Sequence, residues 1–356
     1  MATRAYEVPQ REHAILEEII QYYLDRHEAI SARTLAKISR LSLSPTTIRN
    51  LMEDLSTAGL LTTEGVTRGR IPTQKAFAIH VARLGERKVQ PKARPPQIAA
   101  MEEGKPERLQ AVVHQMGGFL AGQTGCLALA ALPQHDRYPL DWVRFASMPD
   151  RQVLVTLRTL FGDLWCKLLV SADPFPDDLL EEVGRFINTT YRGRTLAAIR
   201  NDIMAGEPKE LLASMPSLGA AFRMLRKAFE WEQGRDRPTW GTDNLYRIPE
   251  LHVPEQLLSI HRALSDAEFL SDTLQRGRQV NGGWIAIGTE TGYPGLENCA
   301  LTGYPFGWRN WQGLVAVLGP MRMNYAQVFG LTAECAGVID RFLQNSAAGA
   351  PPQEAD

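Results

Sequence analysis

The apolar positions of the first 84 residues recur at helical spacing in four short runs, which predicts four amphipathic helices. The runs lie in "QREHAILEEIIQYYLDRH", "ISARTLAKIS", "SPTTIRNLMEDLSTAG" and "TQKAFAIHVARL". Between the last two runs, residues 60–63 and 68–71 favour a pair of short strands with a turn at Gly65. Three helices, a two-stranded wing and a fourth helix are the order of a winged helix-turn-helix.

The third run carries the start and stop signals of a helix. Ser44 is a good N-cap, Pro45 fits the first helical position, and Gly59 is a natural C-cap. One face is an apolar stripe formed by Ile48, Leu51, Met52 and Leu55. The opposite face presents side chains of the kind that read base edges or grip phosphates, namely Thr46, Thr47, Arg49 and Asn50. For such a helix taken alone, a solvated polar face is the alternative, so the neighbouring elements decide.

Charge is distributed unevenly along the chain. The net charge is -1 over 356 residues, but residues 31–83 hold eight Lys and Arg against three acids, a local balance of +5. Arg68 and Arg70 lie on the predicted wing, beside Gly69. A basic segment on a neutral chain indicates a nucleic-acid-binding module joined to something else.

Beyond residue 84 the pattern changes twice. Residues 85–108 are rich in proline and charge, which predicts a flexible linker that passes into a helix from Leu109. Strand patterns follow in "CLALAAL", "LDWVRFASM", "RQVLVTLRTL" and "LWCKLLV"; a mainly helical stretch and further strands come next. We interpret this half as α+β, an antiparallel sheet flanked by helices and interrupted by an inserted helical segment. Residues 345–356 are predicted to be a disordered tail.

The sequence shows no pattern typical of a catalytic or metal site. The motifs HExxH, GxSxG and GxxxxGK[ST] are absent, the four cysteines form no CxxC pair, and the seven histidines are scattered. We therefore expect no enzyme, no cofactor and no metal. The segment "GTETGYPGLENC" could cradle a phosphate, but tight turns explain its glycines more simply. Six aromatic residues between positions 284 and 311 favour a core or an interface, with a ligand pocket as the alternative.

The chain also lacks the pattern of a targeting or membrane segment. Its start, "MATRAYEVPQREHAIL", has no continuous apolar region, and no stretch approaches the roughly 18 apolar residues of a membrane span. We expect a soluble, cytoplasmic protein without a membrane partner.

Taken together, these segments resemble the heat-inducible transcription repressors of the HrcA type. "LSPTTIRNLMEDLSTAGLL" followed by "GRIPTQKAF" looks like that family's reading helix and wing. "GCLALAALP", "YRGRTLAAIRNDI", "IAIGTETGYPGLENCALTGYPF" and "LGPMRMNYAQV" resemble later family blocks in the same order, so the resemblance spans about residues 8–343. The family usually carries His-Thr-Ser-Ala before its Gly-Arg-Ile-Pro; here "EGVTRGRIPT" puts Arg68 in place of a small residue.

The resemblance implies a domain plan. A winged-helix DNA-binding domain would occupy residues 1–84 and the linker residues 85–108. A GAF-like regulatory domain would take residues 109–192 and 243–344, with an inserted dimerisation segment at 193–242. The DNA-binding residues carried over by position are Ser44, Thr46, Thr47, Arg49, Asn50, Arg68, Gly69 and Arg70.

The function implied is that of a dimeric repressor. It would bind an inverted-repeat operator upstream of chaperone operons of the groE and dnaK type until heat shock, with the chaperonin GroEL supporting its active form. In this hypothesis Arg49 and Asn50 contact bases, whereas Thr46, Thr47, Arg68 and Arg70 contact phosphates. The alternative is a winged-helix repressor whose GAF-like domain senses a small molecule.

Overall fold

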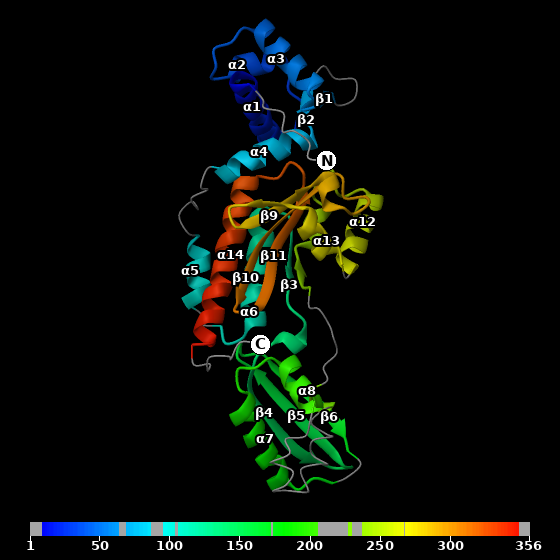
Figure 1. Ribbon diagram of the computed structural model, residues 1–356. Coiled ribbons are helices and arrows are strands. Elements are labelled where there is room, and N and C mark those ends of the chain that lie inside the picture. The colour runs from blue at the N-terminus through cyan, green and yellow to red at the C-terminus, as the bar shows by residue number, and fades with distance from the viewer. Residues whose placement is uncertain are drawn as a thin grey trace.

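The computed structural model arranges the chain as three units along one long axis (Figure 1). A winged helix lies at one end, a six-stranded sheet with helices on both faces lies in the middle, and a three-stranded sheet with its own helices lies at the far end. The structure describes residues 9–63, 69–86, 95–103, 106–171, 174–205, 227–229, 237–266 and 268–348.

The first unit confirms the predicted order of elements. Helices α1 (Gln10–Arg26), α2 (Ala32–Ile38) and α3 (Pro45–Thr57) precede strands β1 (Leu61–Thr63) and β2 (Arg70–Pro72), and α4 (Gln74–Glu86) follows. The two strands pair antiparallel, and β2 also bridges to Ile30 before α2. The predicted turn at Gly65 lies outside the described residues. The three apolar stripes of α1, α2 and α3 meet in one buried cluster.

Part of the predicted linker is ordered and packed. Helix α5 (Pro96–Glu103) lies inside the range 85–108, and Ile98 is fully buried against the cluster that includes the last helix. The prediction of a flexible linker is therefore wrong for this helix. The sequence pattern does not predict this helix, because "PPQIAAMEE" is rich in proline and charge and contains only two large apolar residues, Ile98 and Met101.

The central unit is an antiparallel sheet in the order β7-β3-β11-β10-β9-β8. Its strands are β3 (Leu127–Ala131), β7 (Thr239–Trp240), β8 (Arg278–Val280), β9 (Gly283–Ile287), β10 (Cys299–Trp308) and β11 (Trp311–Pro320). Side chains alternate between two cores. One face packs on α6 (Leu109–Thr124) and α14 (Tyr325–Ser346), and the other on α11 (Thr242–Leu245), α12 (Pro254–Ser265) and α13 (Phe269–Arg276).

The far unit corrects the predicted division of the chain. Strands β4 (Leu140–Met148), β5 (Gln152–Thr159) and β6 (Leu164–Val170) pair with one another in a separate sheet. They share a core of their own with α7 (Asp177–Tyr191) and α8 (Leu196–Ala205). The sequence pattern predicts these strands in the main sheet and an insertion that begins only at residue 193. Alternating patterns reveal strands but not their partners, which explains the difference.

Other expectations fall partly outside the described residues. The mainly helical segment predicted at residues 193–242 is described at 193–205, 227–229 and 237–242, where α8 is a helix but β7 is a strand; the tail beyond residue 348 is not described. Helix α14 extends to Ser346, slightly past the predicted start of the tail. No helix in the described part of the chain is both long and apolar enough to cross a membrane.

Candidate nucleic-acid interface

The start of α3 is built as its sequence predicts. The Ser44 side-chain oxygen accepts a hydrogen bond from the Thr47 backbone N–H at 3.1 Å, and the two hydroxyl oxygens lie 2.8 Å apart. Pro45 takes the first helical position, where no N–H is needed. After the cap residue Ala58, the chain turns at Gly59 with φ +73°. Ser44 is thus a capping residue, and its hydroxyl is engaged with Thr47.

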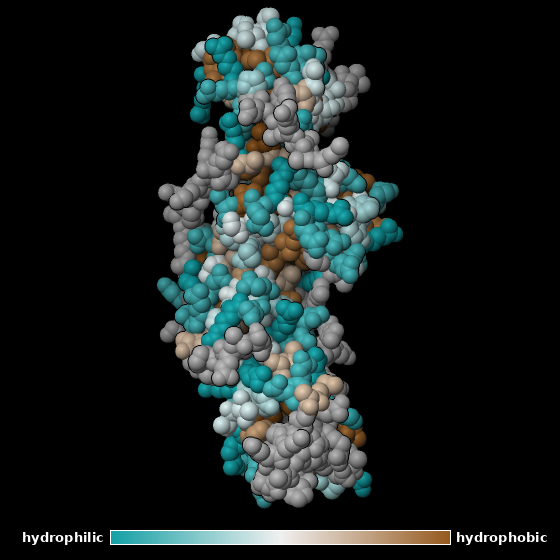
Figure 2. All heavy atoms as spheres, in the orientation of Figure 1, coloured by the Kyte–Doolittle hydropathy of each residue, from teal (hydrophilic) through white to brown (hydrophobic). Residues whose placement is uncertain are grey.

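The outer face of α3 is open to solvent. Thr46, Thr47, Arg49 and Asn50 are all exposed, whereas Ile48, Met52 and Leu55 beneath them are buried. The helix therefore presents polar side chains outward from a firmly packed base. In the face shown by Figure 2, hydrophilic side chains cover most of this tip of the molecule, with some hydrophobic atoms among them, and further hydrophobic atoms show at the neck below it.

The wing residues have different structural positions. The Arg70 guanidinium donates to Glu53 of α3 at 3.0 Å, which ties the return strand of the wing to the reading helix. Gly69 is buried, and a Cβ there would lie 2.7 Å from the Cβ of Ala29. Arg68 lies outside the described residues. Gly69 therefore serves close packing of the wing rather than a surface contact.

The loop that leaves α3 is fixed by side chains of α4 and its cap. The Thr73 hydroxyl donates to the carbonyl oxygens of Gly59 and Leu60 at 2.8 and 3.2 Å. The Lys75 ammonium donates to the Ala58 carbonyl at 2.9 Å, where a cation also complements the negative end of the helix dipole. Lys75, the second residue of α4, enters the sequence prediction only through the local positive charge.

Three further cations contribute to the local positive charge but are not among the predicted DNA-binding residues. Arg33 and Lys37 of α2 and Arg40 just after it are exposed, on the helix that packs against α3. In a helix-turn-helix, the first motif helix crosses the nucleic-acid backbone, so cations there suit phosphates. The backbone N–H of Arg40 donates to Glu18 of α1 at 3.0 Å, which holds this turn in place.

Behind the reading face, α1 and α4 are joined by a half-buried acid–histidine contact. A ring nitrogen of His80 lies 2.9 Å from a Glu17 carboxylate oxygen. Burial raises the pKa of Glu17, but the hydrogen bond and the charge of His80 outweigh it, so the pKa lies below its ordinary value. Burial, with Arg83 nearby, lowers the pKa of His13 on the same helix. The described residues contain no group of three or more side chains that could hold a metal ion.

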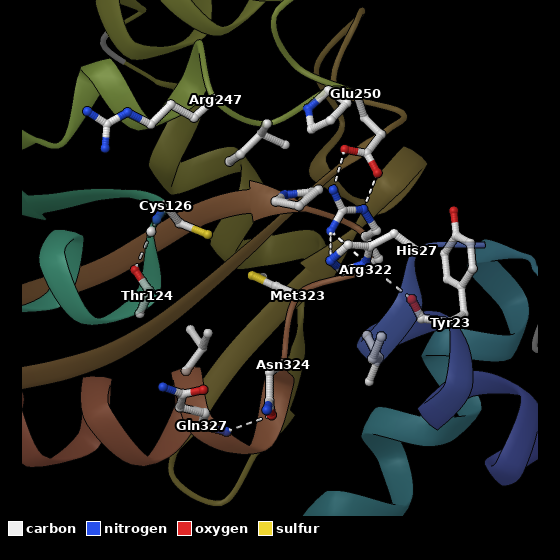
Figure 3. A pocket seen from close by; sticks show the side chains of 16 residues that line it. Tyr23, His27, Thr124, Cys126, Arg247, Glu250, Arg322, Met323, Asn324 and Gln327 are labelled. Carbon is white, nitrogen blue, oxygen red and sulfur yellow. Dashed lines mark hydrogen bonds and ion pairs between the residues drawn. The ribbon is translucent and has the colours of Figure 1, made fainter.

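A cleft of about 710 Å³ lies between the C-terminal end of α1 and the central unit. Figure 3 shows Tyr23 and His27 of the winged helix on one side, and Cys126, Arg322 and Asn324 of the central unit on the other. The guanidinium of Arg322 points to the Glu250 carboxylate and to the His27 ring.

Two family models match the chain over most of its length. Residues 7–84 match "Winged helix-turn-helix transcription repressor, HrcA DNA-binding". Residues 110–329, more than half of the chain, match "HrcA protein C terminal domain". The chain belongs to the HrcA family. This family consists of heat-inducible transcription repressors, and the winged helix described above is its DNA-binding domain.

Individual HrcA relatives cover nearly the whole chain. The heat-inducible transcription repressor HrcA of Sphingopyxis alaskensis is 29% identical over 353 residues, covering 95% of this chain and 98% of that protein. The HrcA of Chromobacterium violaceum is 27% identical over 338 residues, covering 94% and 98%. A crystal structure of a hypothetical protein at 2.2 Å resolution is 18% identical with a TM-score of 0.68, covering 96% of this chain and all of that one, and so shares the fold.

Proposed function

We propose that the chain acts as a homodimer that binds an inverted-repeat operator upstream of chaperone operons of the groE and dnaK type and represses them until heat shock. The observation that carries this proposal is the exposed polar face of α3 on a capped, packed winged helix in an HrcA chain. Two α3 helices would enter successive major grooves about 34 Å apart, or a multiple of it.

The proposal assigns distinct roles to the exposed residues. Arg49 and Asn50 would contact base edges, because both side chains can form paired hydrogen bonds with bases. Thr46 and Thr47 would contact phosphates, together with Arg68 of the wing. Arg70 would contribute to phosphate binding through a guanidinium that already ties the wing to Glu53. Its removal would weaken binding to all sequences and lower the salt slope by about one.

The far unit offers a surface for a second copy of the chain. Three apolar side chains on one face of the edge strand β6 are exposed to solvent. They are Leu164 (43% exposed), Leu168 (51%) and Val170 (69%). Facing positions on β5 and β4 add Leu154 and Ala146. An exposed apolar face of this kind favours an isologous contact, which fits a palindromic operator.

The proposed dimer surface can be tested by a substitution that introduces a charge. Leu168→Asp should shift the protein from dimer to monomer in sedimentation equilibrium, because two desolvated carboxylates would face an apolar contact. Thr189→Asp, at an exposed position on α7, is the matched control and should leave the dimer intact. A dimer that survives Leu168→Asp would place the contact elsewhere.

The remaining expectations belong to the same proposal. The central unit would act as a GAF-like regulatory domain in a cytoplasmic protein without catalysis or cofactor, and GroEL would support the active form. Both faces of its sheet are packed with buried side chains. Regulation through the stability of this unit therefore fits the structure, since folded proteins are only marginally stable.

The deciding experiment is binding to a labelled duplex carrying the inverted repeat found upstream of the host's chaperone operons. A scrambled duplex is the control, and both are measured across salt concentrations at growth and heat-shock temperatures. Tight, selective binding that collapses on heating supports the proposal. Equal, weak binding to both duplexes would contradict it.

Small-molecule sensing is the second candidate, and the 710 Å³ cleft is the observation that favours it. A ligand there would contact both the winged helix and the central unit. A metabolite screen by thermal shift separates the two candidates, because a sensor gains stability with its ligand.

A further inference from the structure

The winged helix joins the central unit through an apolar contact. Phe77 of α4 and Tyr325 of α14 are both buried, with ring centroids 6.1 Å apart. Val81 of α4 is buried in the same cluster as Ile287 of β9. Hydrophobic contact is strong but not directional, so this packing alone holds the two units together without fixing their angle.

A polar clamp fixes α4 against the central sheet. The Gln74 side-chain N–H groups donate to the Ile287 carbonyl at 2.7 Å and to the Thr289 hydroxyl at 3.0 Å. Its side-chain oxygen accepts from the Thr289 backbone N–H at 3.2 Å. At the other end of α4, Asn281 donates to the Leu84 carbonyl at 3.2 Å. Both ends of the helix are thus held by directional bonds.

A second clamp holds α1 across the cleft. Arg322 forms a two-pronged contact with the Glu250 carboxylate, in which Nη2 donates to Oε2 at 2.8 Å and Nε donates to Oε1. Its remaining nitrogen, Nη1, lies 2.9 and 3.0 Å from the two ring nitrogens of His27, the residue that ends α1 (Figure 3). The guanidinium is therefore oriented by Glu250 and presented to the winged helix.

The His27 ring is also held within its own helix. Its Nδ1 lies 3.2 Å from the Tyr23 carbonyl oxygen. The Arg322 side chain is only 12% exposed, so its bonds are shielded from water.

We propose that Gln74 and Arg322 are positioning residues for operator binding, because the two clamps fix the angle between the winged helix and the central unit. They touch no DNA. In the dimer of the proposed function, on which this inference rests, a fixed angle sets the distance and direction between the two α3 helices. Binding of one α3 helix then presents the other at the second half-site with a high effective concentration.

The test compares DNA probes that differ only in half-site geometry. One duplex carries the inverted repeat, one carries a single half-site, and one carries the repeat with about five extra base pairs, half a helical turn, between its halves. The proteins are the full-length parent, Arg322→Ala, Gln74→Ala and the control Arg200→Ala. Arg200 of α8 forms a half-buried ion pair with Asp136, in the connection between β3 and β4, away from both clamps.

The clamps predict a specific pattern of binding. Arg322→Ala and Gln74→Ala should each bind the inverted repeat about tenfold more weakly, as loss of preorganised bivalency requires. Their affinity for the single half-site should equal that of the parent. They should also discriminate less between the normal and the lengthened spacer. Arg200→Ala should behave as the parent on all three probes.

Two results would overturn the inference. Either the clamp variants bind all three probes as the parent does, or they lose half-site and repeat binding equally, as a merely destabilised winged helix would. If Arg322→Ala fails to fold, Glu250→Gln replaces it in the test. This variant removes the carboxylate that orients Arg322 and should show the same pattern of binding to the three probes. A parent chain that does not prefer the inverted repeat would instead refute the proposed function.

Discussion

Substitutions of Ser44, the N-cap of α3, can separate an effect on the stability of this helix from an effect on DNA binding. Ser44 accepts the Thr47 N–H at 3.1 Å, and this acceptor satisfies one of the unpaired donors of the first turn of α3. Ser44→Ala removes it. Since the first turn is exposed, water replaces part of the bond, and the expected cost is about 1 kcal/mol.

Ser44→Asp keeps the acceptor and adds a negative charge at the positive end of the helix dipole. The helix should be as stable as in the parent or more so, by about 0.3–1 kcal/mol. Against DNA the same charge is unfavourable. A carboxylate about 4 Å from a phosphate costs roughly 1 to 4 kcal/mol, depending on how much water remains between them.

The assay pairs amide hydrogen exchange in α3 with binding to the operator duplex. Ser44→Ala should lower protection in the first turn about fivefold, the factor that corresponds to 1 kcal/mol. Ser44→Asp should preserve protection and still lose operator affinity. If Ser44→Asp bound the operator as tightly as the parent, the start of α3 would not face the DNA backbone, and the proposed orientation would be wrong.

Three further predictions follow from the winged helix. Arg49→Ala should cost about 1–3 kcal/mol of operator binding and relax base preference, measured on duplexes with single base changes. Gly69→Ala should lower the melting temperature because its Cβ would meet that of Ala29 at 2.7 Å, and adding Ala29→Gly should restore part of the loss, since the backbone atoms of residue 29 at 3.0 and 3.1 Å remain. Burial raises the pKa of Glu17, but the hydrogen bond and the charge of His80 outweigh it, so the folded-state pKa lies below its ordinary value. The stabilising contribution of this carboxylate is therefore present above the ordinary pKa and is lost as the pH falls through the depressed folded-state pKa. Glu17→Gln should therefore flatten the acid limb of a stability–pH curve.

Local signals predicted the winged helix well because each was specific to its position. Ser44, Pro45 and Gly59 mark the ends of α3, and the apolar spacing between them identifies its buried face. The polar residues of α3 were predicted as exposed, and they are. Gly69 was expected at the DNA surface but is buried, because a glycine that permits close approach looks in sequence like one that permits a turn.

Long-range features could not be predicted in the same way. The pattern of Val153, Val155 and Leu157 identifies β5 as a strand with one buried face, but it would be the same in either sheet. Gln74 and Ile287 are 213 residues apart, and Arg322 and His27 are 295 residues apart, so no spacing rule connects them. Such contacts depend on how complete units pack, which a local pattern does not encode.

The distribution of hydrophobic clusters bears on how heat could release such a repressor. One cluster runs without a break from Ile19 of α1 through Phe77 of α4 to Tyr325 of α14 and Val317 of β11. The winged helix therefore has no boundary at which the central unit could loosen without affecting it. The far unit has a cluster of its own around Val155 and Ile187, although Leu160 and Phe161, between β5 and β6, belong to the shared cluster. In the proposed dimer, heating that loosens the shared cluster would thus free the joint that the two clamps hold, and with it the placement of the two reading helices, while the core of the far unit keeps its own packing.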